Sequence, residues 1–437
     1  MHYSWLSALS LLSASLIVPL ATAFQPHLRG DMSVKHALSA VPSNWECVGQ
    51  PGNESTMDLH IALKSQNESA LIDALYEVST PGNPKYAPHF SSPECTQPPR
   101  CRRYRVHLSQ EEVSALVAPD PTTISLMNSW LGQHNVSSSL MTHGGSWLTV
   151  SGISVSQAND LLNASYMLYQ HNSSNMTVLR TMSYGVPGEL FELVKTVVPS
   201  TSFGSPPPPS TQQQTLRKRS GVPLARSSPV QALSSRSTDT PVTPSSLISL
   251  YNLGGYVPTQ TNRNVLALVG NYGETPNQSD LTIYMNKFRP DGANATYTLV
   301  EVGGDTGNAS VGDAIAIIEF TEGITYPTPH IYYSIADQDS FLAWLNDILN
   351  QTDVAQTIMG SSLGLENDIT EDYAIEVCNL FAQLGARGST VIFASGDGGL
   401  QDCSQGTGGT GTGQFIPTFP ASCTCVVLSP LTNSTRA

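Results

Sequence analysis

The segment Ser395-Gly396-Asp397-Gly398-Gly399 contains a carboxyl group at a position suited to ligand binding or catalysis. It directly follows residues 390–394, an apolar run that predicts a buried strand. Ligands of open α/β sheets bind at the carboxyl ends of the strands, which makes Asp397 a candidate site residue. A glycine turn with a capping Asp is the structural alternative for the same five residues.

A second acidic position lies earlier, where Asp313 opens the apolar run 314–318. On a helix, Asp313 and Ile317 share a face because they are four residues apart. The same run is also compatible with a buried strand, so the local structure is left open by the pattern.

A histidine-dependent hydrolase site would have to use His330, the one histidine after Ser220. A serine–histidine–aspartate triad needs a histidine within hydrogen-bonding distance of both a nucleophile and an orienting acid. The sequence around His330 suggests no such partner. We therefore expect an exposed or packed histidine rather than a catalytic one.

The elements that would position these residues alternate between strand and helix patterns across residues 244–437. Apolar runs predict strands at 264–270, 357–359 and 390–394. Helical spacing predicts helices at 341–349 and 372–384, the second stopped by Gly385. This alternation predicts the α/β fold class with a parallel sheet.

Residues 24–200 predict a separate α+β domain. Strand patterns lie at 59–63 and 147–150 and a helix pattern at 70–78, and a further helix begins at Ser109 with Glu112 at the capping-box position. A linker rich in Pro and Ser follows at 201–243. Its Lys218-Arg219 pair is either a solvated charge cluster or the cleavage site of a kexin-like processing protease.

Several of these segments resemble the sedolisins, the serine-carboxyl peptidases that include fungal tripeptidyl-peptidases. The matching segments are 59–64, 78–81, 107–113, 117–119 and 130–131 in the first half, and 312–320, 323–329 and 379–397 in the second. The resemblance implies a subtilisin-like parallel-sheet peptidase domain, partial in this chain, preceded by an α+β activation prodomain. Extra residues from about Cys95 to Arg103 interrupt the match, and they are either a real loop or an unspliced intron.

The resemblance also implies roles for individual residues. Asp313 stands at the position of the catalytic Glu, Ile317 at that of the second triad carboxylate, and Asp397 at that of the Asp that stabilises the oxyanion. The family's S-G-T-S segment, which carries the nucleophilic Ser, does not occur in the chain. The family's calcium site lies beyond the matched part, so we expect no metal and no cofactor in this chain.

Two functions follow as expectations. The first is a tripeptidyl-peptidase-like zymogen that acts on peptides or proteins at acid pH and is catalytically incomplete in this chain. The second is a non-catalytic secreted binder whose prodomain inhibits an active relative. Protonated carboxyl donors and carboxylate bases both tie such chemistry to acid conditions.

The N-terminus and the glycosylation sequons predict an extracellular protein. Residues 6–20 are mostly apolar and precede Ala21-Thr22-Ala23, so we expect a signal peptide at 1–23 that is cleaved after Ala23, with a buried or membrane helix as the alternative. N-x-S/T candidates for glycosylation occur along the chain. They are Asn53, Asn67, Asn135, Asn163, Asn172, Asn175, Asn277, Asn294, Asn308, Asn350 and Asn433.

The charge of the chain limits the classes of partner that it can bind, and its cysteines indicate which disulfides and metal sites it can form. A net charge of −14 with only 12% charged residues argues against a nucleic-acid partner, and no membrane partner is expected. Among the seven cysteines, Cys403 and Cys423 could close a Gly-rich loop as a disulfide, and Cys95 and Cys101 a small one. Cys423-Thr424-Cys425 does not have the spacing of a zinc site.

Overall fold

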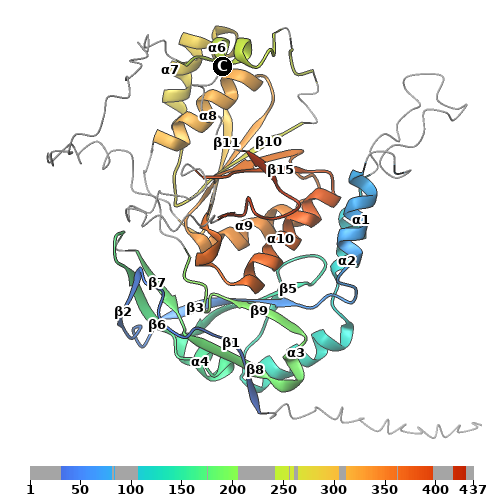
Figure 1. Ribbon diagram of the computed structural model, residues 1–437, viewed down its shortest axis with the longest axis vertical. Helices are drawn as coiled ribbons and strands as arrows, with labels where there is room; N and C mark the ends of the chain where they lie inside the picture. Colours follow the sequence, from blue (N-terminus) through green and yellow to red (C-terminus); the bar gives the residue numbers. More distant parts are fainter. Residues whose placement is uncertain are drawn as a thin grey trace, which may run out of the picture.

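The computed structural model describes residues 31–80, 83, 107–174, 176–204, 242–254, 256–259, 264–304, 312–361, 363–396 and 417–429. Two domains can be followed in Figure 1, where the N-terminal domain lies at the bottom and the C-terminal domain above it. The predicted signal peptide with Ala23, the Lys218-Arg219 pair, Asp397 and Cys403 lie outside the described residues.

The N-terminal domain consists of antiparallel strands and short helices. Its elements are β1 Met32–Ala37, β2 Trp45–Gly49, β3 Thr56–Leu63, α1 Ala70–Ser79, α2 Gln110–Val117, α3 Pro121–Gln133, β4 Ser139–Leu140, β5 Trp147–Ser154, α4 Val155–Leu162, β6 Met167–His171, β7 Thr177–Arg180, β8 Ser183–Pro187, η1 Gly188–Leu190 and β9 Val194–Val198. The main sheet has the order β4-β5-β3-β9, and smaller sheets pair β2-β6-β7 and β1-β8.

Local sequence accounts for much of this domain. The predicted capping box is confirmed. Ser109 Oγ accepts a hydrogen bond from the backbone N–H of Glu112, and the Glu112 carboxylate accepts one from the backbone N–H of Ser109. One face of β3 carries Leu59 and Ile61 into a core of the domain's own, while Ala62 on the other face contacts the C-terminal domain. The main sheet therefore serves two cores.

The C-terminal domain is an α/β unit around a parallel sheet. Its elements are α6 Pro244–Leu250, β10 Leu266–Gly270, α7 Gln278–Phe288, η2 Pro290–Gly292, β11 Tyr297–Val302, α8 Gly312–Thr325, β12 His330–Ile335, α9 Gln338–Asn350, β13 Thr357–Gly360, β14 Gly364–Leu365, η3 Glu366–Asp368, α10 Glu371–Ala386, β15 Thr390–Ala394, β16 Thr418–Phe419 and β17 Val427–Ser429. The strands follow the order β11-β12-β10-β13-β15-β17, all parallel. The predicted parallel α/β sheet is confirmed.

Helices cover both faces of this sheet, and the alternation along β10 shows it. Ala267 and Val269 pack with α9 and α10, whereas Leu266 and Leu268 pack with α7 and α8. Figure 1 shows α9 and α10 between the parallel sheet and the N-terminal domain. The N-terminal domain thus docks on helices rather than on the strands themselves.

The structure decides one local alternative that the sequence left open and corrects one predicted helix end. The run after Asp313, left open as helix or strand, belongs to α8. The helix expected to stop before Gly385 continues through it to Ala386. A Cβ at residue 385 would lie 3.1 Å from Leu75 of α1, so this glycine permits the close approach of α1 rather than ending the helix.

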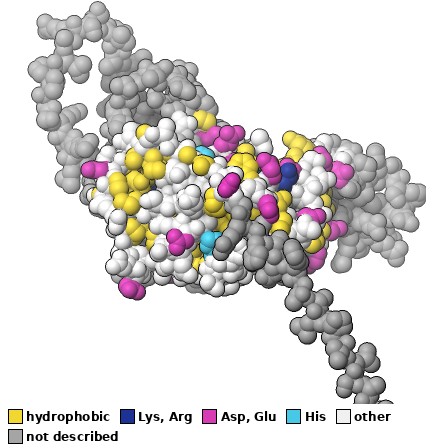
Figure 2. Space-filling view, turned by 90° about the horizontal axis from the view of Figure 1, so that it is seen from below, with side chains coloured by type: hydrophobic (Ala, Val, Ile, Leu, Met, Phe, Trp, Pro, Cys, Tyr) yellow, Lys and Arg dark blue, Asp and Glu magenta, His cyan; other side chains and the backbone are white. Residues whose placement is uncertain are grey.

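The surface is acidic, in line with the net charge of −14. Figure 2 views the molecule from below, onto the N-terminal domain, and shows acidic side chains scattered among uncharged ones with little Lys or Arg. In the part of the chain that the structure describes, no helix is long and apolar enough to cross a membrane.

Candidate active site and the docked N-terminal domain

The carboxyl ends of the parallel strands lie level with one another. The register aligns Gly270 of β10 with Ser334 of β12, and Val269 with Gly360 of β13. At this edge the chain leaves β15 through Ser395 and Gly396. The helix α8 runs back along the sheet, so its first turn, with Asp313, belongs to the same edge.

Glu274 joins Asp313 at this edge, and sequence reasoning missed it. It lies in the turn after β10, where Tyr272 and Gly273 have positive φ values of 58° and 72°. The Gly273 N–H donates to the Ile335 carbonyl (2.8 Å), and the Tyr272 hydroxyl donates to a backbone carbonyl beyond β13 (2.8 Å). The turn is thereby held on both sides, which fixes where Glu274 can point.

The surroundings of Glu274 perturb its titration. Burial is the main cause that raises its pKa to about 7, and the negative charge of nearby Asp313 adds to it. One of these two carboxyl groups is exposed and the other is held towards its protonated form. Such a difference in surroundings lets one group act as an acid and the other as a base. The signal was present in the sequence, because Glu274 follows the predicted strand 264–270 just as Asp397 follows 390–394.

Tyr332 completes this group from β12. Its side chain is fully buried, and within the described residues its hydroxyl has no hydrogen-bond partner. A side chain at residue 270 would collide with that hydroxyl, so Gly270 makes room for it. Burial, Glu274 and Asp313 all raise the pKa of Tyr332. A neutral O–H donor therefore lies near both carboxyl groups.

Ile317 lies on α8 one turn after Asp313, as its spacing predicts. It is half-buried and packs against the apolar cluster that includes Leu268 and Tyr332. An isoleucine there contributes packing and no charge, so it cannot orient or polarise Asp313. The charge of Asp313 acts instead on the carboxyl group of Glu274.

The raised pKa of Glu274 gives a prediction about stability. Its pKa is higher in the folded protein than in the unfolded chain, so folding takes up a proton and stability falls as pH rises through about 7. Glu274→Gln removes this dependence. Because the group is partly solvated, we expect the variant to be more stable than the parent by only about 1–2 kcal/mol at pH 8, and equal near pH 4.

Urea unfolding at several pH values measures this effect. Glu46→Gln, a change at an exposed position of β2, is the control and should leave the pH profile unchanged. A Glu274→Gln profile parallel to that of the parent at all pH values would contradict the shifted pKa.

His330 has partners that the sequence did not suggest. Its Nδ1 lies 2.8 Å from Oε1 of Glu322, and its Nε2 lies 2.9 Å from Oγ1 of Thr325. An acid, a histidine and a hydroxyl in this order resemble a hydrolase triad. However, the Glu322 and His330 side chains are 2% and 0% exposed, and His330 begins its strand at the opposite edge of the sheet. The group is closed to substrate and is structural.

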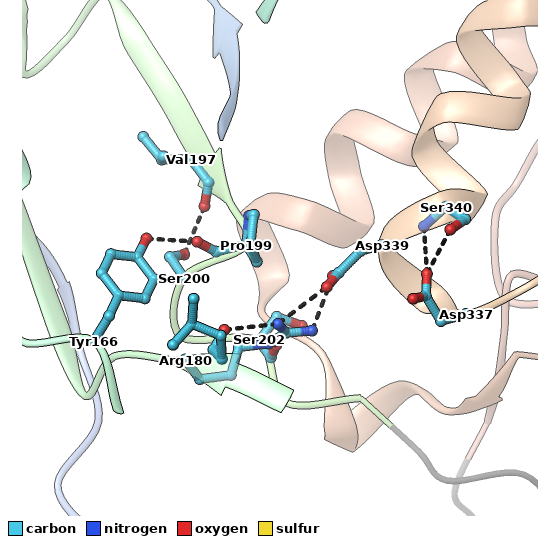
Figure 3. Close-up of polar contacts among 10 residues, drawn as sticks. Tyr166, Arg180, Val197, Pro199, Ser200, Ser202, Asp337, Asp339 and Ser340 are labelled. Atoms are coloured by element: carbon cyan, nitrogen blue, oxygen red, sulfur yellow. Dashed lines mark hydrogen bonds and ion pairs between the residues drawn. The ribbon is translucent and has the colours of Figure 1, made fainter. Parts of the chain in front are cut away.

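An ion pair between a buried arginine and a partly exposed aspartate joins the two domains (Figure 3). Arg180 at the end of β7 is 3% exposed and donates from both terminal nitrogens to the Asp339 carboxylate at the start of α9 (2.9 and 3.1 Å). Its Nε also donates to the carbonyl of Ser202. A bidentate guanidinium–carboxylate contact fixes orientation as well as distance.

Apolar and backbone contacts continue the interface. Val113 and Val117 of α2 pack with Ala382 and Ala386 of α10. The backbone N–H of Leu108 donates to the Ala386 carbonyl (3.0 Å). The N-terminal domain therefore holds α9 and α10 from two sides.

Asp339→Ala should weaken this docking. The change leaves the Arg180 guanidinium buried with backbone partners only, and such truncation costs about 2 kcal/mol at the low end of the range for buried charge pairs. Once the linker is cut by a protease, sedimentation measurements should give a dissociation constant for the two pieces that is about 30-fold higher than in the parent. Asp347→Ala, on the exposed face of the same helix, is the control. Equal dissociation for both variants would contradict the role of the pair.

The expected Cys403–Cys423 disulfide is wrong. Cys423 pairs with Cys378 of α10 over a Cα–Cα distance of 5.3 Å. Sequence reasoning favoured the nearer cysteine across a Gly-rich loop, but the fold places α10 against the segment after β16. Cys425 stays reduced, and its thiol donates to the Cys378 carbonyl (3.3 Å).

The glycosylation candidates differ in exposure. Asn175, Asn308 and Asn433 lie outside the described residues. The exposed candidates are Asn53, Asn67, Asn135, Asn163, Asn172, Asn277 and Asn294. Asn350 is only partly exposed, because it lies between the domains. Within the described ranges no cluster of His, Cys, Asp and Glu has the form of a metal site.

Comparison with known proteins identifies the N-terminal domain first. Residues 43–98 and 96–203 match the model of the pro-kumamolisin activation domain. The matched residues include β3, α2 and Arg180, which form the contacts described above.

Similarity to known proteins extends over most of the chain. A probable tripeptidyl-peptidase SED3 of Trichophyton verrucosum is 27% identical over 90% of this chain and 65% of its own length. Tripeptidyl-peptidase SED2 of Arthroderma otae is 26% identical over 94% of this chain and 68% of its own, and tripeptidyl-peptidase sed4 of Aspergillus fumigatus is 27% identical over 89% and 64%. The resemblance to the sedolisin family is thereby confirmed, and the chain spans about two-thirds of the length of these relatives.

Proposed function

We propose that this chain is the proenzyme form of a secreted acid serine-carboxyl peptidase of the tripeptidyl-peptidase type. The observation that carries the proposal is the activation domain, docked through Arg180 and Asp339 on a parallel α/β domain whose acidic groups gather at the carboxyl edge. The parallel sheet with helices on both faces is compatible with a subtilisin-like peptidase domain. Peptides or proteins would be the substrates.

The roles at the site follow from the chemistry of carboxyl groups. In this proposal Asp313 is the base and protonated Asp397 donates a hydrogen bond to the oxyanion. Glu274 and Tyr332 each lie near Asp313 in a buried setting, and both are held towards their neutral forms. Below neutral pH Glu274 is protonated, which relieves the repulsion between the two carboxylates.

The printed residues do not supply a complete catalytic set. Ile317 replaces the second triad carboxylate, and the sequence has no S-G-T-S segment. We therefore propose that hydrolysis is absent from a protein made of these 437 residues alone. The alternative is a non-catalytic binder that inhibits a relative, and the self-contained core of the N-terminal domain, with Leu59, Ile61 and Trp130, favours it as a separable unit.

An acid-pH assay on the natural secreted product tests both functions. Hydrolysis of short peptides at pH ~4, where carboxyl groups are half-protonated, is measured together with the intact mass of the protein. The proposal expects hydrolysis only from a product that carries a nucleophilic Ser segment. Hydrolysis by the 437-residue chain would overturn the proposed incompleteness. Inhibition of an active tripeptidyl-peptidase by the inactive chain would favour the binder.

A further inference from the structure

Asn350 combines a glycosylation signal with a structural contact between domains. It is the last residue of α9 and the first of the sequon Asn350-Gln351-Thr352. Its side-chain amide donates from Nδ2 to the carbonyl of Met141 (2.6 Å), and its Oδ1 accepts the backbone N–H of His143 (3.3 Å). Both partners belong to the β4–β5 turn of the N-terminal domain.

These two bonds fix the orientation of the amide. The His143 N–H needs an acceptor and the Met141 carbonyl needs a donor, so the nitrogen of Asn350 must face Met141. An N-linked glycan replaces one hydrogen on that nitrogen. That nitrogen lies 2.6 Å from the Met141 carbonyl, so the first sugar would be attached at an atom that is itself part of the contact between the domains.

The contact leaves little room for a sugar beside the bonded amide. The pocket between the domains here opens to solvent on one side, but the space inside it is about 10 Å³, which is what one water molecule needs. Its lining includes Ser114, Gly144 and Asn350. A Cβ at Gly144 would come within 2.6 Å of a Val117 methyl, so the turn that bonds Asn350 packs tightly on α2 and cannot draw back towards its own domain.

Hydrogen bonds from two side chains to backbone carbonyls hold the chain around Asn350 in place. Gln110 of α2 donates from its amide to the carbonyls of Leu349 and Asn350 (3.3 and 3.2 Å). Arg387 after α10 donates to the carbonyls of Gln351 and Thr352 (2.6 and 3.0 Å). Because both ends of the sequon are held, a glycan cannot be accommodated by a small shift of the chain.

We propose that N-glycosylation of Asn350 and docking of the N-terminal domain exclude each other. A chain glycosylated at Asn350 keeps its N-terminal domain away from α9, and a chain that docks first protects Asn350 from modification. The exposed candidates Asn277 and Asn294 on the same C-terminal domain have no such contact in the structure. The proposal rests on the secretion proposed above.

Site-specific glycan mapping in a yeast secretory host tests the proposal. A host signal sequence directs the full chain to the glycosylation machinery, so the test does not depend on the natural destination. The linker is cut at Arg217-Lys218-Arg219, and gel filtration separates complexes of the two pieces from dissociated C-terminal pieces. Release of glycans in heavy-oxygen water then marks each formerly occupied Asn for mass spectrometry.

We expect Asn350 occupancy to be at least about tenfold lower in the complex than in the dissociated fraction, with Asn277 and Asn294 equal in both. In Asp339→Ala, whose docking is weakened, total occupancy of Asn350 should rise. Thr352→Ala keeps the Asn350 side chain but abolishes the sequon, and it should leave the complex intact. A glycan on Asn350 in the complex at the level of Asn277, or no rise in Asp339→Ala, would overturn the proposal.

Discussion

Replacing Glu322 by Ala is expected to destabilise the C-terminal domain by about 1–3 kcal/mol, because it leaves the buried imidazole of His330 without a hydrogen-bonding partner at Nδ1. The two side chains are 2% and 0% exposed, and the Nδ1–Oε1 distance is 2.8 Å. His330 starts β12 and Glu322 lies in the last turns of α8. Loss of the contact therefore loosens the helix that carries Asp313.

Urea unfolding of the full chain, followed by circular dichroism, measures this loss. Glu319→Ala, on the same helix but near Tyr284 and Asp280 of α7, is the matched control and should cost less than about 1 kcal/mol. The double variant Glu322→Leu with His330→Leu tests the cause, since apolar replacement of both members of a buried pair is often neutral. A double variant as unstable as Glu322→Ala would show that helix packing, rather than the unpaired histidine, sets the loss.

The fold could be predicted from sequence wherever one local signal determined the structure. The capping box at Ser109 and Glu112 specified the start of α2, and the alternation of strands and helices specified a parallel sheet. The run after Asp313 was undecided because a short apolar segment suits a helix and a buried strand equally. Only its packing against β10 and β12 determines that it is a helix.

The candidate site was predicted in part. Asp313 and Ile317 share a helix face, as their spacing indicated, and the positional argument for Asp397 applies equally to Glu274 after β10. Tyr332 could not be found in this way, since a tyrosine within a buried strand has the same pattern whether its hydroxyl is functional or packed. The same holds for the partners of His330, which reach it only through the turn between α8 and β12.

The disulfide shows why contacts between distant segments escape local reasoning. Cys403 is closer to Cys423 in sequence, and short loops are entropically easier to close. Tertiary packing overrides this preference, because α10 lies across the sheet beside the residues that follow β16 and brings Cys378 to Cys423. The buried Phe419 and Tyr373 pack together next to it and hold the two segments in place.

Removing the Cys378–Cys423 disulfide is expected to cost about 4 kcal/mol, the loop-closure entropy of a crosslink of this length. The two cysteines are separated by 45 residues, and the loop includes β15 and the segment that leads to Asp397. Cys378→Ser, Cys423→Ser and the double variant should be equally unstable in urea, because each removes the same crosslink. Peptide mapping without reduction should recover Cys378 and Cys423 in one disulfide-linked pair of peptides.

Cys425→Ser is the matched control for this prediction. Its thiol is half-buried and donates to the Cys378 carbonyl, so it shares the surroundings of the disulfide without taking part in it. We expect a loss below about 1 kcal/mol there. A mapped Cys403–Cys423 pair, or a Cys378→Ser variant as stable as the parent, would contradict the crosslink.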